Sequence, residues 1–182
     1  MGSSKQLLQF KKQSLLYHAV SIALAADVKP VIVVLGSNSE NLITELPDKK
    51  TDIVFNEKWK EGIASSIRYG LDRLQEKYPA TDAVILMVCD QPFVTTELLN
   101  QLIHQQKETK KPIVASGYGN AVGTPALFHK SLFPQLIGLS GDTGARKIIQ
   151  QHIQNVAIIP FPEGEIDIDT PADFEKLTNG NR

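Results

Sequence analysis

The chain contains one cysteine, Cys89, among its 182 residues. A single cysteine excludes an internal disulfide and a metal site built from clustered cysteines. Because Cys89 lies inside an apolar run, we expect a small buried hydrophobic side chain there rather than a nucleophile. The four histidines have no metal-ligand spacing, which predicts structural or surface positions for them.

The chain also has almost no net charge and no long apolar segment. The formal net charge of −1 provides no field that favours nucleic acid or an anionic membrane as partner. No apolar stretch is long enough to span a bilayer and no signal-like pattern opens the sequence, which favours a cytoplasmic protein. The sequence has neither the glycine spacing of a Walker A loop nor the Gly-x-Ser-x-Gly elbow of serine hydrolases.

What is present is an ordinary balance of 42% hydrophobic and 21% charged residues, in a length that fits one domain over 1–182. Strand-like apolar runs alternate with segments of helical spacing, which predicts an α/β fold with a mostly parallel sheet. The predicted strands cover 30–36, 52–55, 82–89, 112–115 and 156–160. The predicted helices cover 13–26, 38–46, a segment from Gly62 onward, 95–108, 142–152 and the residues after Thr170. In the segment from Gly62, the spacing predicts one apolar helix face formed by Ile63, Ile67, Leu71 and Leu74.

Asp90 is the most informative residue of the chain. The apolar run over 82–89 stops at this carboxylate, and Pro92 prevents simple continuation of the strand. Because a charge inside a sheet is costly, we expect Asp90 at the strand's carboxyl end, where open α/β sheets bind ligands. A second acidic stop contains Asp167 and Asp169. Carboxylates at two strand ends can hold one hard cation such as Mg²⁺ between them.

Two segments in the first half suit phosphate or nucleotide binding. Gly2 and the small residues before Lys5 can present backbone amides and one cation to a phosphate; the alternative is a flexible amino terminus. Residues 56–66 predict a strand end, a loop and a helix that begins with two hydroxyls. Free amides at that helix start favour an anion or a base edge, and the alternative is that Ser65 and Ser66 merely face solvent.

Glycine-rich stretches follow in the second half. Three glycines between residues 117 and 123 predict a backbone that turns tightly or approaches a ligand closely. Residues 139–147 form a glycine-rich loop that leads into a helix with two cations. This arrangement suits a clamp for an anionic substrate, and the alternative is a helix capped by Asp142 with two solvated cations.

In this order, the segments resemble the nucleotidyltransferases that complete the molybdenum cofactor, and the cytidylyltransferase branch more than the guanylyltransferase branch. The guanylyl branch usually has an acidic residue where this chain has Ser4, and a Pro-Leu-Ala-Gly-type turn where this chain has residues 62–66. Each motif is weak alone, but together they are specific. The matching motifs are Met1-Gly-Ser-Ser-Lys5-Gln-Leu-Leu8, Asn56-Glu-Lys-Trp59, Gly62-Ile-Ala-Ser-Ser66, Cys89-Asp-Gln-Pro92, Gly123-Thr-Pro-Ala-Leu-Phe128, Ser140-Gly-Asp-Thr-Gly-Ala-Arg146 and Asp167-Ile-Asp-Thr-Pro-Ala-Asp173.

The resemblance implies a Rossmann-like three-layer fold and transfer of CMP from CTP to the terminal phosphate of molybdopterin, with release of pyrophosphate. It implies Lys5, Asp90 and Asp169 as catalytic residues, with Mg²⁺ held by both aspartates and Asp167 as the substitute for Asp169. The residues expected to bind the nucleotide are Gly2, Lys5, Asn56, Gly62, Ser65, Ser66 and Asp90, and those expected to bind the acceptor are Gly123, Thr124, Pro125, Gly141, Asp142 and Arg146.

One departure from the family pattern concerns the amino terminus. The family opens with a strand and a Leu-Ala-Ala-Gly-x-Ser-x-Arg loop before Met-Gly-x-x-Lys, and these 182 residues begin at that methionine. The missing strand is normally central to the sheet. Its neighbours are expected to lose backbone partners, at about 1–3 kcal/mol for each group buried unpaired. We therefore expect impaired catalysis from these residues alone.

Two other functions are compatible with the same residues. A nucleotidyltransferase that uses GTP, or that acts on a sugar or alditol phosphate, would keep the metal site and differ in the acceptor pocket around 117–128. A non-catalytic protein that binds the pterin cofactor and delivers it to a molybdenum hydroxylase would need no Mg²⁺. The two acidic strand ends favour an enzyme, whereas the missing strand favours the carrier.

Overall fold

The computed structural model describes residues 5–46 and 51–166. Strands and helices alternate over most of these residues, as the hydrophobic periodicity predicts. The strands are β1 (Gln9–Phe10), β2 (Gln13–Ser14), β3 (Ile32–Leu35), β4 (Asp52–Phe55), β5 (Ala83–Leu86), β6 (Ile113–Tyr118), β7 (Ala121–His129) and β8 (Val156–Pro160). The α-helices are α1 (Leu15–Ala25), α2 (Ser39–Ile43), α3 (Ile63–Lys77), α4 (Thr96–Thr109), α5 (Phe133–Ile137) and α6 (Arg146–Gln151).

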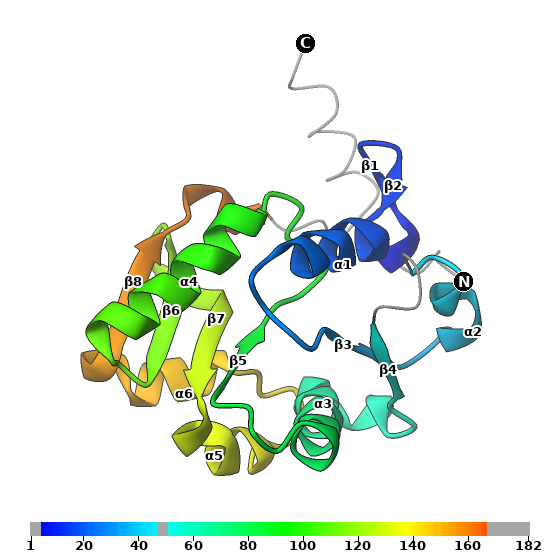
Figure 1. Ribbon diagram of the computed structural model, residues 1–182. Helices are drawn as coiled ribbons and strands as arrows, with labels where there is room; N and C mark the ends of the chain where they lie inside the picture. Colours follow the sequence, from blue (N-terminus) through cyan, green and yellow to red (C-terminus); the bar gives the residue numbers. More distant parts are fainter. Residues whose placement is uncertain (1–4, 47–50, 167–182) are drawn as a thin grey trace.

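The strands form a mixed arrangement that is interrupted between β3 and β5 (Figure 1). Strand β3 pairs in parallel with β4, and a separate four-stranded sheet has the order β5-β7-β6-β8. Among the described residues, neither β3 nor β5 has a strand paired to its second edge. A central strand is what the family resemblance implies at such a position.

Strand β7 departs from the mostly parallel sheet that the sequence predicts. The chain turns back near Gly119, whose φ of +51° lies in the left-handed region that suits glycine, and β7 then runs antiparallel to β6. It is antiparallel to β5 as well, while β6 and β8 are parallel. The glycines and Pro125 break the apolar alternation over this segment, so the sequence pattern does not reveal the strand.

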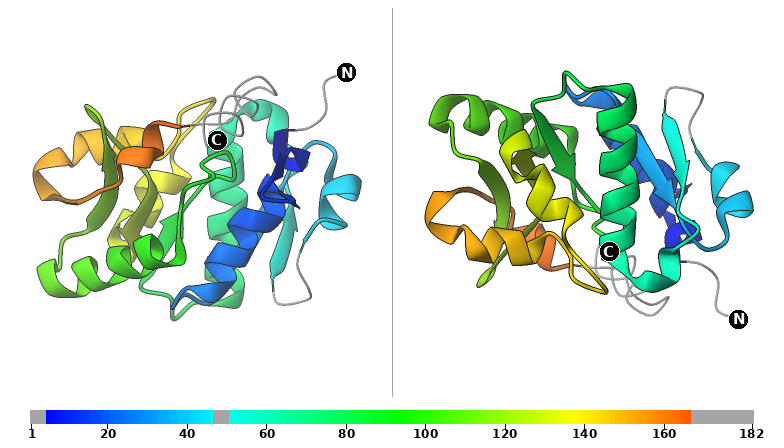
Figure 2. Two further views of the ribbon diagram at one scale, coloured as in Figure 1. Left: turned by 90° about the horizontal axis from the view of Figure 1, so that it is seen from above. Right: turned by 90° about the horizontal axis from the view of Figure 1, so that it is seen from below.

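Helices cover both faces of the strands, which confirms the predicted three-layer α/β fold. Helices α1 and α4 lie on one face, and α3, α5 and α6 lie on the other (Figure 2). Helix α4 packs against β6, β7 and β8, whereas α3 packs against β3 and α5. None of the helices within the described residues has the length and apolarity needed to cross a membrane.

The core is centred on β6 and β7 because these strands are covered by helices on both sides. Ile113 and Ala115 belong to the apolar cluster on the α3 face, while Val114 between them belongs to the cluster on the α4 face. All three are fully buried, and they alternate as a two-residue period requires. The equally apolar β5 stays half-buried along its whole length because it borders the interruption.

Helix α3 follows its predicted apolar face with one exception. Leu71 and Leu74 are buried, and Ile67 packs against the same cluster. Ile63 was predicted to share this face, but its side chain is 44% exposed. It is the first residue of the helix and lies beside the loop at Gly144, beyond the reach of the core.

Candidate active site

Lys5 and Asp90 meet beyond the carboxyl end of β5, although they are 85 positions apart in the sequence. The Lys5 Nζ atom donates to Asp90 Oδ2 at 2.5 Å, and the Asp90 side chain is 17% exposed. The other carboxylate oxygen, Oδ1, is buried and accepts no hydrogen bond from the described residues. Asp90 therefore has one oxygen neutralised by a cation and a second that can take a further positive partner.

The chemistry of Asp90 fits the predicted metal. A buried carboxylate oxygen without a partner is costly unless a donor or a cation reaches it, and Mg²⁺ prefers such oxygens. The described part of the chain contains no group of three or more histidine, cysteine, aspartate or glutamate side chains placed to hold a metal. Gly2, Asp167 and Asp169 lie outside the described residues.

The predicted nucleotide-binding turn is held by a buried polar network. Asn56 Nδ2 donates to Ser65 Oγ at 2.8 Å and to Ser66 Oγ at 3.0 Å, while Asn56 Oδ1 accepts from the backbone of Lys58 at 2.9 Å. Asn56 and Ser65 are almost completely buried, so Ser65 does not face solvent. Asn56 and Ser65 use their hydrogen-bonding groups within the turn, so these two side chains stabilise its conformation.

The start of α3 also contacts the loop that the sequence assigns to the acceptor. The Ala64 amide donates to Gly141 O at 3.2 Å, so this amide is not free for an anion. Gly62 has a φ of +95°, and a Cβ there would lie 2.4 Å from the Gly141 carbonyl atoms. Arg68 donates to Leu139 O at 3.2 Å. The fold thus brings the predicted nucleotide turn and part of the predicted acceptor set together.

The rest of the predicted acceptor set is more dispersed. Gly123 and Pro125 are buried in β7, where Pro125 O accepts a hydrogen bond from Ser116 at 2.7 Å. Thr124 between them is partly exposed. Asp142 and Arg146 are both exposed, but α6 begins only at Arg146, so Asp142 does not cap it.

The glycines between 117 and 123 are approached by protein side chains. A Cβ on Gly117 would lie 2.6 Å from Ile158 Cγ2, and one on Gly123 would lie 2.2 Å from the Tyr118 hydroxyl oxygen. A Cβ on Gly119 would overlap the Glu165 carboxylate. The close approach predicted from these glycines is therefore made within the chain, by side chains of β6, of β8 and of the segment after β8.

Cys89 behaves as a protected thiol next to this site. Burial, and to a smaller extent the neighbouring Asp90 carboxylate, raise the pKa of the Cys89 thiol to about 11, while Lys5 acts in the opposite direction. A thiol with so high a pKa is almost entirely protonated at neutral pH and is a poor nucleophile. This agrees with the hydrophobic role predicted from the sequence.

Two residues near the site were not singled out from the sequence. Gln91 is 5% exposed and lies directly after Asp90, within a motif quoted for the resemblance. Arg68 contacts a carbonyl 71 positions away, and no local pattern signals such a pairing. The motif around Asp90 was the available signal for Gln91.

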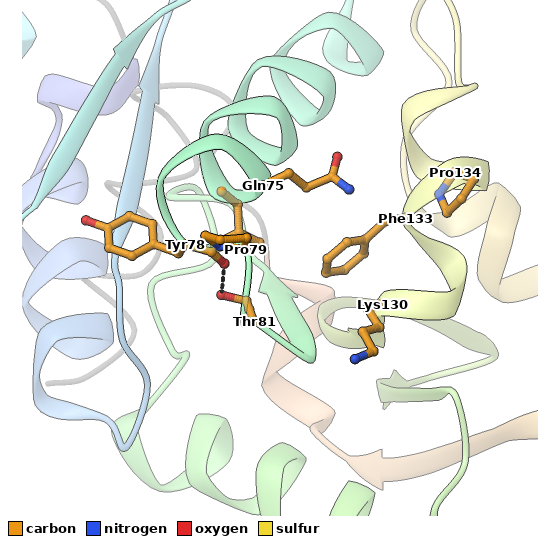
Figure 3. A pocket seen from close by; sticks show the side chains of 8 residues that line it. Gln75, Tyr78, Pro79, Thr81, Lys130, Phe133 and Pro134 are labelled. Carbon is orange, nitrogen blue, oxygen red and sulfur yellow. Dashed lines mark hydrogen bonds between the residues drawn. The ribbon is translucent and has the colours of Figure 1, made fainter.

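The described residues also form a cavity of about 310 Å³ at the opposite end of β5 (Figure 3). Thr81 lies just before the strand and lines the cavity, whereas Asp90 lies beyond the strand's last residue. Phe133, Pro134 and Lys130 line the other wall. Ligands of open α/β sheets bind at the carboxyl ends of strands, so this cavity is separate from the candidate active site.

Comparison with known proteins identifies the family. The pattern of the MobA-like NTP transferase domain matches residues 1–156. The chain belongs to this family. MobA-like domains are nucleotidyltransferases, so the match establishes the coarse activity that the sequence motifs imply and the Rossmann-like character of the fold.

Two curated relatives align over nearly the whole chain. The purine catabolism protein PucB of Bacillus subtilis is 25% identical over 188 residues, which cover 97% of this chain and 89% of PucB. A molybdenum cofactor guanylyltransferase of Vibrio parahaemolyticus is 24% identical, with 97% of this chain and 87% of that protein covered. One relative is named for purine catabolism and the other for guanylyl transfer to the molybdenum cofactor, so the chain is similar to proteins with different designations.

Solved structures show the same fold. The crystal structure of Rv0371c from Mycobacterium tuberculosis has a TM-score of 0.84 and 27% sequence identity, covering 98% of this chain and 91% of that one. A manganese complex of Rv0371c has a TM-score of 0.80 and 26% identity, with 98% and 93% covered. A divalent metal is therefore known in a protein of this fold and similar sequence.

Proposed function

We propose that this MobA-like protein transfers CMP from CTP to the terminal phosphate of a molybdopterin-type acceptor and releases pyrophosphate. The observation that carries the proposal is the Lys5–Asp90 pair beyond β5, with the unpartnered Asp90 Oδ1 beside it. A carboxylate and a cation at the carboxyl end of a sheet strand suit a nucleoside triphosphate and its metal. The family match supports the reaction class.

Each residue of the pair has a defined role in this reaction. Asp90 holds Mg²⁺ through its carboxylate, together with Asp169, or with Asp167 as the substitute. The bound ion supplies positive charge at the α-phosphate. Lys5 contributes a point charge to the outer phosphates, which leave as pyrophosphate. The protein's main task is to hold the attacking phosphate in line with the α-phosphorus.

The turn beginning at Gly62 forms the nucleotide side of this site. Asn56 and Ser65 keep the turn in shape through their buried hydrogen bonds. The adjoining loop at Gly141 and Asp142, with Arg146 after it, faces the acceptor in this proposal. An exposed guanidinium at the start of α6 can bind a pterin phosphate with two parallel hydrogen bonds.

The choice between CTP and GTP rests on opposing observations. The Ser4 position and the turn at residues 62–66 favour CTP, by their likeness to the cytidylyl branch. The relative from Vibrio parahaemolyticus is named a guanylyltransferase, which favours GTP as the alternative donor. The proposed product would serve a molybdenum enzyme, for which a hydroxylase is the proposed recipient.

The test is nucleotidyl transfer by the full-length protein, supplied with molybdopterin and with CTP or GTP labelled at the α-phosphate. We expect label in the pterin product with CTP and Mg²⁺. Asp90→Asn should abolish transfer while leaving the far-UV circular dichroism spectrum unchanged. Asp72→Asn, at an exposed site on α3, is the matched control and should retain transfer. Turnover retained in Asp90→Asn would remove the metal role, and transfer from GTP alone would reassign the donor.

A further inference from the structure

Two segments that the proposed function assigns to different substrates lie against each other. We call residues 56–66 the nucleotide turn and residues 139–144 the acceptor loop. The Ala64 amide donates to Gly141 O at 3.2 Å, and a Cβ on Gly62 would lie 2.4 Å from the Gly141 carbonyl atoms. The two backbones therefore touch directly, with no side chain between them, and these contacts set the position of one segment relative to the other.

The acceptor loop contains a tight turn that suits this contact. The Thr143 amide donates to Ser140 O at 3.3 Å, which closes a four-residue turn. Gly141 has a φ of +62°, and a Cβ there would meet no atom of the described residues within 4 Å. Glycine therefore serves the left-handed backbone conformation of the turn rather than a lack of space. Leu139, just before the turn, is buried in the same apolar cluster as Ala64.

Arg68 joins the two segments from one helical turn further along α3 than Ala64, on the same face of the helix. Its Nη2 atom donates to Leu139 O at 3.2 Å, and its Nη1 atom lies 3.9 Å from Glu61 Oε2. The Glu61 side chain is exposed, so this ion pair contributes little. A hydrogen bond from a charged donor is about twice as strong as one between neutral groups. The bond to Leu139 O is therefore the main contact by which Arg68 holds the acceptor loop.

We propose that Arg68 is a positioning residue for the acceptor. Its hydrogen bond fixes Leu139, two residues before the carbonyl that the Ala64 amide holds and seven residues before Arg146. The inference rests on the proposed function, in which the acceptor loop and Arg146 bind the acceptor phosphate. In-line transfer requires that phosphate at a defined place relative to the nucleotide, and a small displacement is costly. Arg68 thus fixes the acceptor relative to the nucleotide by holding the loop that binds it.

A first experiment measures this role without substrates. The Ala64 amide is at the second position of α3, where amides have no partner within the helix, so its protection from hydrogen exchange depends on Gly141 O. NMR of the full-length protein should show about tenfold faster exchange of this amide in Arg68→Met, the change expected for the loss of one charge-assisted hydrogen bond at a partly exposed site.

Arg73→Met is the matched control for this experiment. Arg73 lies on the same helix and is partly exposed like Arg68, but its charge pairs with Asp52. Exchange of the Ala64 amide should be unchanged in this variant, and equal rates in Arg68→Met and Arg73→Met would overturn the inference. Thermal unfolding checks that each variant folds, and Arg68→Ala, which has the highest helix propensity, repeats the test where Arg68→Met does not fold.

A second experiment measures the kinetics of transfer. Arg68→Met should raise the KM for molybdopterin about tenfold and change the KM for the nucleotide less than twofold, because the nucleotide turn keeps its own hydrogen bonds. Arg68→Lys keeps a charged donor and should lie closer to wild type. A molybdopterin KM that rises no more than the nucleotide KM would overturn the inference. Absence of transfer by the wild-type protein would instead refute the proposed function, and exchange of the Ala64 amide would still decide whether Arg68 holds the loop.

Discussion

Ser65 and Ser66 are adjacent serines on α3 whose replacement by alanine should have very different costs. Ser65 Oγ accepts from Asn56 at 2.8 Å and directs its proton to Gly62 O at 2.8 Å and Lys58 O at 3.0 Å. Ser66 Oγ accepts one bond from Asn56, at 3.0 Å, and is only partly buried. The same substitution at neighbouring positions keeps the change in helix propensity nearly equal.

The magnitudes follow from these hydrogen bonds. An intramolecular hydrogen bond contributes about 1 kcal/mol net, and a buried group left without a partner costs more. Alanine regains about 0.5 kcal/mol of helix propensity at either position. Ser65→Ala should therefore cost about 2 kcal/mol and Ser66→Ala about 0.5 kcal/mol. For a chain of this size these correspond to about 4–8 °C and about 1–2 °C in Tm.

The assay uses two signals during urea unfolding, far-UV circular dichroism for the whole fold and fluorescence of Trp59 for the turn. Trp59 is the only tryptophan and lies within this segment, so its emission reports the turn directly. In Ser65→Ala, Trp59 should respond at a lower urea concentration than the circular dichroism signal. Equal midpoints for Ser65→Ala and Ser66→Ala would refute the view that the buried network holds the turn.

Two further predictions concern titratable groups. Because the pKa of Cys89 is raised to about 11, roughly one thiol in a thousand is ionised at pH 8. Iodoacetamide should therefore label Cys89 far more slowly in the folded protein than in urea. Equal labelling rates, measured by mass spectrometry, would contradict the burial of this thiol. A hydrogen bond from Lys130 lowers the pKa of Asp82 below its ordinary 3.8, so the pair stabilises the fold above that pH and loses this contribution as the pH falls. Lys130→Met should therefore lower Tm at pH 6 and leave it unchanged at pH 2. A decrease in Tm of equal size at both pH values would contradict a stabilising Lys130–Asp82 ion pair.

The elements with a strong local pattern could be predicted from the sequence. The strand at 52–55 was placed at its observed bounds, and Asp90 was expected beyond a strand's carboxyl end, where it lies. Both follow from a short-range signal, because alternating or continuous apolar residues and a sudden charge are properties of neighbouring positions. The family resemblance rests on the same kind of local motif.

Contacts between distant segments could be recognised only in the folded chain. The partner of Ser65 is Asn56, the partner of Gln91 is Gly164, and the oxygen that Lys5 neutralises belongs to a residue 85 positions away. The family resemblance grouped Lys5 with Asp90 and Asn56 with Ser65 in one expected site, but no local pattern indicated these hydrogen bonds, because hydrogen-bond partners depend on which segments the topology brings together. Strand β7 was missed for a related reason, since its order comes from pairing with β5 and β6 rather than from its own pattern.

Local sequence alone thus determined the alternation of strands and helices, the family and the acidic strand end, because each of these depends on residues that are close together in the sequence. The tertiary structure decided that the sheet is mixed and interrupted, that Ser65 is buried in the turn, and that Gln91 links β5 to the segment after β8. The reason is that burial and pairing energies depend on the neighbours that a residue acquires on folding, and those neighbours come from distant parts of the chain.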